Sequence, residues 1–204
     1  MEKIFCIGFN KTATTSLKEF MKLEGYSVAD QIQFEQNFDA IRFGYSDLII
    51  DIIKNDYKEY VFFQDVPFGL PNFYKKLYSE FPNAKYILTV RDNSDTWYQS
   101  LIKYYHLIFS NYTSDFCRVP YIRPKWLCDL WSDGYGSPKQ DPFNKESLTQ
   151  IYEDHIKDVE SFFMDKKNFI KINLNNSEDF YKYEKFLGKK FISTSFPHVN
   201  KSTF

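Results

Sequence analysis

The chain has 204 residues, of which 43% are hydrophobic and 26% are charged, as in most folded globular proteins. Its 26 Lys and Arg residues nearly balance its 27 Asp and Glu residues, so the net charge of -1 gives no general attraction to nucleic acid or to an anionic membrane. We therefore expect a single domain over residues 1–204, no nucleic-acid partner, and a local origin for any anion site.

The cysteines and the first apolar run exclude further classes of protein. Cys6, Cys117 and Cys128 are odd in number and lack the spacing of zinc ligands, so we expect a reducing compartment and no metal site. The apolar run Ile4–Phe9 is too short for a signal peptide or a membrane span. These features predict a cytoplasmic protein with no membrane partner.

The apolar pattern predicts strands that alternate with helices. Short apolar runs bounded by turn residues are typical of buried strands, and apolar residues three or four apart are typical of helices. The predicted strands are residues 3–7, 60–64, 85–90 and 169–174. The predicted helices are one that begins at Thr14 and ends at Gly25, two that carry residues 34–41 and 48–53, and four over residues 73–81, 97–108, 145–164 and 177–187.

This alternation predicts an α/β fold with a central parallel sheet flanked by helices, because parallel strands need crossover connections that cover the sheet. Residues Ser110–Asn144 are rich in Pro, Gly and aromatic residues and are too long for a plain connection. We predict that they are irregular and form a lid or an acceptor-binding insertion.

The segment from Ile7 to Leu17, "IGFNKTATTSL", joins the first predicted strand to the first predicted helix. A loop at this place exposes unpaired backbone N–H groups at the positive end of the helix dipole, which suits an anion. Lys11 can add a charge, and Thr12, Thr14, Thr15 and Ser16 can add hydroxyl donors. The alternative is that these hydroxyl groups only cap the helix.

The loop differs from that of a nucleoside triphosphatase, in which a second glycine and a lysine directly precede the magnesium-binding Ser or Thr. Lys11 comes three residues after Gly8, and Ala13 and Thr14 occupy the places of that glycine and lysine. This placement disfavours a kinase or an ATPase.

Residues Gly8–Leu17 resemble the 5′-phosphosulfate loop of the sulfotransferases, written G-x-x-K-[TS]-[GA]-T-[TS]-[SW]-L. "KYILTVRDNSDTWYQSL", residues 85–101, is similar to the strand and helix with which this family binds the 3′-phosphate of the donor. "DPFNKESL" and the closing "FPHVNKS" look like segments of small bacterial-type members. The resemblance implies a three-layer, P-loop-like α/β fold, the donor 3′-phosphoadenosine 5′-phosphosulfate (PAPS) and the product 3′-phosphoadenosine 5′-phosphate (PAP).

The same resemblance implies the residues that bind the donor. It implies that the 5′-phosphate and sulfonate are bound by Lys11 and by the run Thr12, Ala13, Thr14, Thr15 and Ser16. It implies that the 3′-phosphate is bound by Arg91, Ser100 and Lys201. Ser100 comes nine residues after Arg91, whereas the family spacing is eight, and Gln99 occupies the eighth place. Either one residue is inserted in the turn before the helix or the serine contact differs.

Sulfuryl transfer puts negative charge on the bridging oxygen of the leaving group and requires the acceptor hydroxyl to lose a proton. We assign the first task to Lys11. Asp65 follows a predicted strand and emerges at the edge of the sheet that carries Lys11, so it is the candidate base. Asp65 could instead cap the next segment or pair with a lysine, and His106, His155 and His198 are alternative bases, although the position of His155 on a helix face favours a structural role.

The acceptor is predicted only as a small molecule or a carbohydrate with a hydroxyl or an amine. Aromatic residues in and before the irregular region could bind it or could simply cover the core: Tyr104, Tyr105, Phe109, Tyr112, Tyr121, Trp126, Trp131 and Tyr135. Three basic residues there would tolerate an anionic acceptor: Arg118, Arg123 and Lys125. A nucleotide-binding module without catalysis is the alternative function, and a phosphate-transferring kinase is less favoured.

Overall fold

The computed structural model describes residues 2–110 and 124–197, with side chains for residues 2–106 and 126–197. Four parallel strands form one sheet in the order β2-β1-β3-β4. They are β1 (Ile4–Cys6), β2 (Phe62–Phe63), β3 (Lys85–Thr89) and β4 (Phe169–Ile172). Ile4 is opposite both Phe62 and Lys85, which places the short β1 between two neighbours and buries it.

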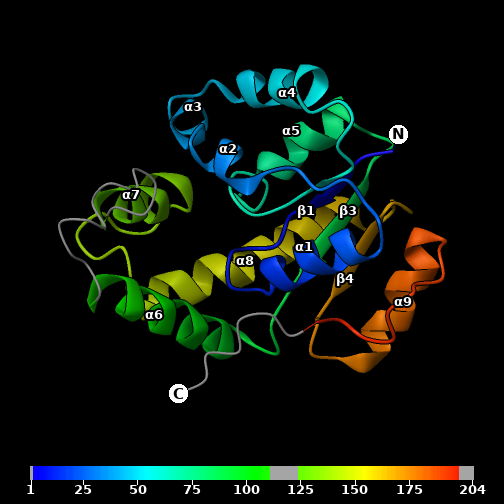
Figure 1. Ribbon diagram of the computed structural model, residues 1–204. Helices are drawn as coiled ribbons and strands as arrows, with labels where there is room; N and C mark the ends of the chain where they lie inside the picture. Colours follow the sequence, from blue (N-terminus) through cyan, green and yellow to red (C-terminus); the bar gives the residue numbers. More distant parts are fainter. Residues whose placement is uncertain (1, 111–123, 198–204) are drawn as a thin grey trace.

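Helices alternate with these strands, as Figure 1 shows. Their bounds are α1 (Thr14–Leu23), α2 (Gln31–Glu35), α3 (Phe38–Arg42), α4 (Ser46–Asn55), α5 (Phe73–Glu80), α6 (Ser94–Ser110), α7 (Pro124–Asp129), the π-helix η2 (Leu130–Gly134), α8 (Lys145–Phe163) and α9 (Ser177–Leu187).

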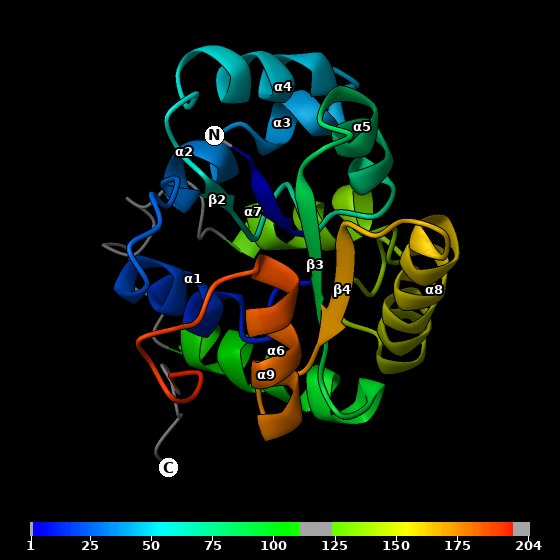
Figure 2. The same cartoon turned by 90° about the vertical axis from the view of Figure 1, so that its right-hand side faces the viewer.

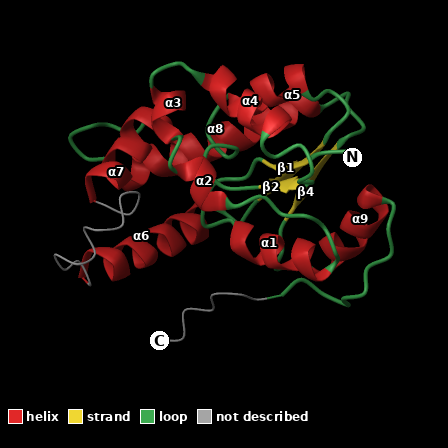
Figure 3. Ribbon diagram, turned by 45° about the horizontal axis from the view of Figure 1, so that its top comes forward, coloured by secondary structure: helices red, strands yellow, loops and turns green. Residues whose placement is uncertain are grey.

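The sheet is the middle of three layers. Successive residues of β1 point to opposite faces, so Phe5 packs with α4, α5, α6 and α8, whereas Ile4 and Cys6 pack with α1 and α9. Figure 2 shows α8 and α9 on different sides of β3 and β4, and Figure 3 shows the strands enclosed by helices. The predicted α/β fold with a parallel sheet flanked by helices is therefore confirmed.

Most predicted elements are present, with corrections to their extent. The predicted strand 60–64 is only the two residues of β2, and the backbone N–H groups of Val61 and Phe62 both donate to the carbonyl of Ser27. The single helical region expected around residues 34–41 is two short helices, α2 and α3. The break lies at Asn37, whose side chain donates to the carbonyl of Gln33 over 2.7 Å.

The prediction that residues 110–144 are irregular is wrong for residues 124–134, which form α7 and η2. These helices form because Leu127, Leu130 and Trp131 can be buried on one side of the segment. Arg42 of α3 fixes them from outside through ion pairs with Asp129 at 3.1 Å and Asp133 at 2.7 Å. Residues 111–123 of the predicted insertion lie outside the described residues.

Candidate functional site

The loop between β1 and α1 has a backbone that ordinary residues seldom adopt. Lys11 and Ala13 both have left-handed conformations, with φ of 67° and 71°, although neither is a glycine. Ala13 is the N-cap of α1 and has no side chain that could accept from the N–H groups of the first turn. The loop thus presents the positive end of a helix without the usual internal cap, a geometry suited to an external anion.

Two hydrogen bonds fix this loop to β3 and to the segment after it, and a third lies within the loop. The Thr12 hydroxyl donates to the Phe9 carbonyl over 2.5 Å within the loop, and it lies 2.6 Å from the Thr89 hydroxyl. Nε of Arg91 donates to the carbonyl of Lys11 over 2.8 Å. Because these residues are about 80 positions apart in sequence, the bonds hold the loop in a shape that its own sequence does not favour.

Gly8 is required by a close approach of backbones. A Cβ atom at Gly8 would lie 2.1 Å from Oγ1 and 2.8 Å from the backbone nitrogen of Thr89. A Cβ atom at Gly69, in the loop after β2, would lie 2.4 Å from the carbonyl oxygen of Gly8. The loops that follow β1 and β2 therefore touch through their main chains, and the end of β3 touches the first of them.

Arg91 adds a second cation beside the loop. Its backbone N–H donates to the Tyr152 hydroxyl over 2.9 Å, and Tyr152 stacks on Trp97 with ring centres 4.5 Å apart. Burial lowers the pKa of Arg91, but a guanidinium stays charged in proteins. Its terminal nitrogens form no hydrogen bond with any residue that the structure describes, so two planar donors remain for an anion.

Asp65 lies at the same edge of the sheet, on the loop after β2. Its carboxylate accepts from the Thr14 hydroxyl over 3.1 Å and from the Val66 N–H over 3.0 Å, and the residue is 8% exposed. Burial raises its pKa, whereas these two hydrogen bonds and the charge of Lys11 lower it. Asp65 also has a left-handed backbone, with φ of 66°, so three of the strained residues in the described chain belong to this one site.

The ammonium group of Lys11 lies over the ring of Tyr104 of α6, 3.9 Å from its centre. Burial lowers the pKa of Lys11, the nearby Asp65 raises it, and Arg91 lowers it further. Lys11 is therefore held between a carboxylate, a guanidinium and an aromatic face. The structure brings Lys11, Asp65 and Arg91 together as the sequence predicts.

Two neighbours of this group were not among the predicted site residues. The sequence indicates Tyr104 only as a member of the aromatic cluster, and no sequence pattern predicts its contact with Lys11. Glu35 of α2 is buried, and burial and the nearby Asp65 raise its pKa to about 8. Gln31 donates to the Glu35 carboxyl group from one turn earlier. A single glutamate in an amphipathic stretch gives no indication that it will be buried beside another carboxyl group.

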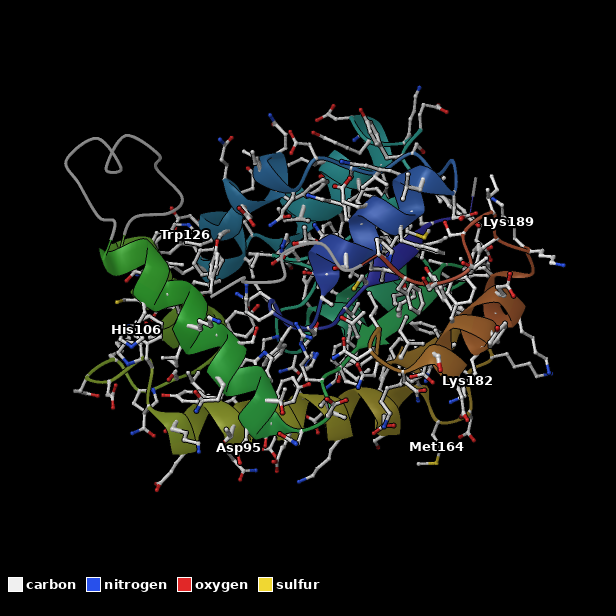
Figure 4. All side chains as sticks on the ribbon, turned by 60° about the horizontal axis from the view of Figure 1, so that its bottom comes forward. Asp95, His106, Trp126, Met164, Lys182 and Lys189 are labelled. Carbon is white, nitrogen blue, oxygen red and sulfur yellow. The ribbon has the colours of Figure 1, made fainter. Side chains whose placement is uncertain are left out.

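The histidines are placed differently from Asp65. His155 is buried behind the loop, with Nε2 3.0 Å from the carbonyl oxygen of Ile7 and its ring against Phe9, and burial lowers its pKa to about 4. His155 thus has the structural role that its position on a helix face favours in the sequence. His106 is exposed near the end of α6 remote from Asp95, as Figure 4 shows. His198 lies outside the described residues.

The structure describes some of the residues that are expected to bind the 3′-phosphate of the donor. Asn93 caps α6 by accepting from the N–H of Thr96 over 2.7 Å, and Ser100 is half-exposed in the second turn of this helix. Ser100 and Tyr104 are four residues apart and so share one face of α6, the face that reaches Lys11. Gln99 is exposed. Lys201 lies outside the described residues.

Five of the aromatic residues named for the acceptor have described side chains, and three of these are parts of the core. Tyr105, Trp131 and Tyr135 are buried, and Trp131 donates to the Tyr105 hydroxyl over 2.8 Å. Trp126 is half-buried against Phe38. The structure does not describe the side chains of the other residues named there: Phe109, Tyr112, Arg118, Tyr121, Arg123 and Lys125. Trp97 is also in the core, and its Nε1 donates to the carbonyl of Asn10 over 3.0 Å.

Within the described ranges, no group of three or more His, Cys, Asp and Glu side chains is arranged to hold a metal ion. The same part of the chain contains no helix with the length and apolar character needed to cross a bilayer. What the site offers is a set of cations and N–H donors around one end of a helix, with a buried carboxylate beside it.

Comparisons with known proteins identify a family and a similar fold. A model of the family described as "Sulfotransferase domain" matches residues 3–204. The crystal structure of a sulfotransferase from Alicyclobacillus acidocaldarius has a similar fold, with a TM-score of 0.56 and 15% sequence identity. The match covers 98% of this chain and 87% of that protein. A search of curated protein sequences found no match.

Proposed function

The chain belongs to the sulfotransferase domain family, and from this premise we propose that it transfers a sulfuryl group from PAPS to a hydroxyl or amine acceptor. The observation that carries the proposal is the convergence of Lys11, Arg91 and the uncapped start of α1 on one loop, beside the carboxylate of Asp65. We call Lys11, residues 12–16 and Arg91 the donor side of the site. Ser100 and Lys201 are its further proposed members, at the 3′-phosphate.

The donor side fits a phosphosulfate because all of its principal groups donate hydrogen bonds or carry positive charge. The N–H groups at the start of α1 suit the 5′-phosphate and sulfonate, and the planar guanidinium of Arg91 suits the 3′-phosphate. Lys11 supplies a point charge for the oxygen that leaves with the phosphate. These groups provide the required positive charge, so we propose that transfer needs no metal ion.

Sulfuryl transfer forms a bond from sulfur to the acceptor oxygen, breaks the bond from sulfur to the bridging oxygen, and releases one proton from the acceptor. We assign this proton to Asp65. Its raised pKa makes it a better proton acceptor than an ordinary carboxylate, and its hydrogen bond with Thr14 places it next to the loop that carries Lys11. The geometry favours Asp65 over His155, whose ring is occupied behind the loop.

We also assign a role to the segment 110–144 within a single domain. Its described part packs on the core beside the site, since Tyr135 of this segment contacts Phe9 with ring centres 4.7 Å apart. We propose that this segment forms a wall for the acceptor, which is a small molecule or a carbohydrate.

Calorimetric titration with PAP, with and without magnesium, and with ATP as a control, tests the donor side. We expect tight binding of PAP that does not depend on magnesium and much weaker binding of ATP. A requirement for magnesium, or a preference for ATP, would instead favour a kinase. Transfer of labelled sulfate from PAPS to an acceptor then separates an enzyme from a nucleotide-binding module without catalysis.

A further inference from the structure

Two glutamates of the described chain, Glu24 and Glu35, are buried in opposite surroundings. The carboxylate of Glu24 accepts from the backbone N–H groups of Ile192 and Ser193, each over 2.9 Å, and lies near the charge of Lys189. Burial raises the pKa of Glu24, but these partners outweigh burial and hold it below the ordinary value. Glu24 therefore shows what this fold provides for a buried glutamate that is charged.

Glu35 has no comparable set of partners. Within the described ranges, its carboxyl group accepts one hydrogen bond, from the Gln31 side chain, and forms no ion pair. Lys18 acts on it only through its charge, and the Lys18 ammonium group lies 3.8 Å from the carboxylate of Glu19. A carboxylate that is buried with one neutral donor is strongly destabilised, so a carboxyl group in this position keeps its proton.

Helix α2 places Glu35 near the segment that contains Asp65. Figures 2 and 3 show α2 beside β2, the strand that ends two residues before Asp65. The ring of Phe34 packs on Phe63 and on Phe68, with ring centres 5.8 and 5.0 Å away. Phe34 thus contacts residues on both sides of Asp65 in the sequence, and Glu35 is the next residue of the same helix. The two buried carboxyl groups therefore belong to neighbouring segments that pack directly on each other.

Two amide side chains join Glu35 to the residue before Asp65. Nε2 of Gln64 donates to Gln31 over 2.8 Å, and Gln31 in turn donates to the Glu35 carboxyl group. The chain of bonds is kept if both amides are turned over, because a protonated carboxyl group can donate as well as accept. Neither arrangement requires a charge on Glu35.

The charges around the pair determine which carboxyl group ionises first. Burial, Asp65 in the loop after β2 and Asp30 at the start of α2 raise the pKa of Glu35 to about 8, although its hydrogen bond and Lys18 of α1 lower it. Asp65 is stabilised as a carboxylate by two hydrogen bonds and by the charges of Lys11 and Lys18. Asp65 therefore loses its proton before Glu35 does.

We propose that Glu35 is a second carboxyl group of the site, which keeps its proton beside a charged Asp65 and so limits this side of the site to one negative charge. The inference rests on the proposed function and adds a residue to it. Glu35 acts through Asp65 and Lys11 rather than on the reacting atoms, so it is a positioning residue. Loss of its proton would put a second buried charge beside the loop that binds the phosphosulfate, and binding of the donor would weaken.

Titration of the two glutamates tests the protonation state directly. Protein labelled with 13C in its glutamate side chains is titrated by NMR, and Glu24→Gln and Glu35→Gln identify the two signals by their loss. We expect Glu24 to titrate below the ordinary glutamate pKa of about 4.3 and Glu35 several pH units above it.

Binding of PAP, measured by calorimetry, links this proton to the site. In the parent we expect the Kd for PAP to rise about fivefold between about pH 7 and about pH 9, as Glu35 ionises. Glu35→Gln has the same shape but cannot ionise, so its Kd should stay nearly constant over this range. Glu24→Gln is the matched control. It removes a buried carboxyl group at the opposite end of α1 from the donor loop, so it should keep the pH dependence of the parent.

Three results would overturn the proposal while the donor side stands. They are a Glu35 signal that titrates in the ordinary glutamate range, a parent Kd that does not change with pH, and a Kd that rises equally in the parent and in Glu35→Gln. The last result would assign the rise to Lys11, whose pKa is lowered by burial and by Arg91. If Glu35→Gln does not fold, Glu35→Asp identifies the labelled signal instead. Failure of PAP to bind at neutral pH would count against the proposed function itself.

Discussion

The donor side and the carboxyl groups beside it, Asp65 and Glu35, are built in opposite ways. On the donor side, the Thr12 hydroxyl and the carbonyls of Asn10 and Lys11 are all engaged by partners within the protein. Asp65 and Glu35 are both buried, and burial raises the pKa of each carboxyl group although the hydrogen bonds that each accepts lower it.

The difference shows what each half contributes. The donor side is held in shape before any ligand arrives, so binding there requires little reorganisation. Burial of Asp65 and Glu35 disfavours the charged form of each carboxyl group, so this half is suited to taking up a proton. The following substitutions test this contrast, in order of decreasing expected effect.

Lys11→Ala tests whether the donor side supplies charge to the reaction. We expect the rate of transfer to fall about 1,000-fold, because the charge on the leaving oxygen loses its partner. The fold should be unaffected, since Ala and Lys incur a similar cost at the left-handed φ of 67°. Single-turnover kinetics with labelled PAPS measure the rate, and thermal unfolding provides the control. A variant that keeps a tenth of the parent rate would contradict this role.

Asp65→Asn tests the boundary between the two halves. We expect kcat to fall about 100-fold through loss of the base. In the parent, kcat should rise with pH as Asp65 loses its proton, at a pH above that of an ordinary carboxyl group because burial raises its pKa. This rise should be absent in Asp65→Asn. Full activity in this variant would exclude Asp65, and parallel Asn variants of His106, His155 and His198 would then identify the base.

Arg91→Ala should weaken binding rather than chemistry. Loss of a charged, two-pronged phosphate contact is expected to raise the Kd for PAP roughly 30-fold, as measured by calorimetry. Arg91→Lys keeps a charge but lacks the planar fork and the Nε donor to the Lys11 carbonyl, so it should recover only part of the affinity. An unchanged Kd in Arg91→Ala would remove Arg91 from the donor side.

Tyr104→Leu should have the smallest effect. Its ring holds the Lys11 ammonium group, and an exposed cation–π contact contributes about 0.5–1 kcal/mol. We expect kcat/KM to fall about threefold, with Tyr104→Phe, which keeps the aromatic face, close to the parent. If Tyr104→Phe falls as far as Tyr104→Leu, the hydroxyl rather than the ring face carries the contribution.

The sequence allowed much of the fold to be predicted, together with the placement of Lys11 and Arg91 beside one loop, because both depend on local patterns. Apolar spacing indicates α8 and α9 almost to the residue, and the run from Gly8 to Leu17 indicates an anion loop. The same reasoning missed α7 and η2. Those helices are stabilised by contacts with distant residues such as Arg42, and no local spacing reports them.

The surroundings of Asp65 and Lys11 could not be predicted for a related reason. Glu35 and Tyr104 come from separate parts of the chain, and each is an ordinary residue in its local context. Their significance arises only when folding places Glu35 near Asp65 and Tyr104 against Lys11. The left-handed conformations of Lys11 and Ala13 are equally hidden, since the hydrogen bonds that enforce them come from Thr89 and Arg91.

The contact between Gly8 and Gly69 has a mechanical consequence. The two main chains touch without intervening side chains. The loop that carries Lys11 and the loop that carries Asp65 are therefore held rigidly against each other. The separation of the main chains that carry Lys11 and Asp65 is therefore set by backbone dimensions, and only the side chains of these two residues span the remaining gap. A methyl group at Gly69 would push the two loops apart. It would thus change the spacing of the reacting groups while leaving each group chemically intact.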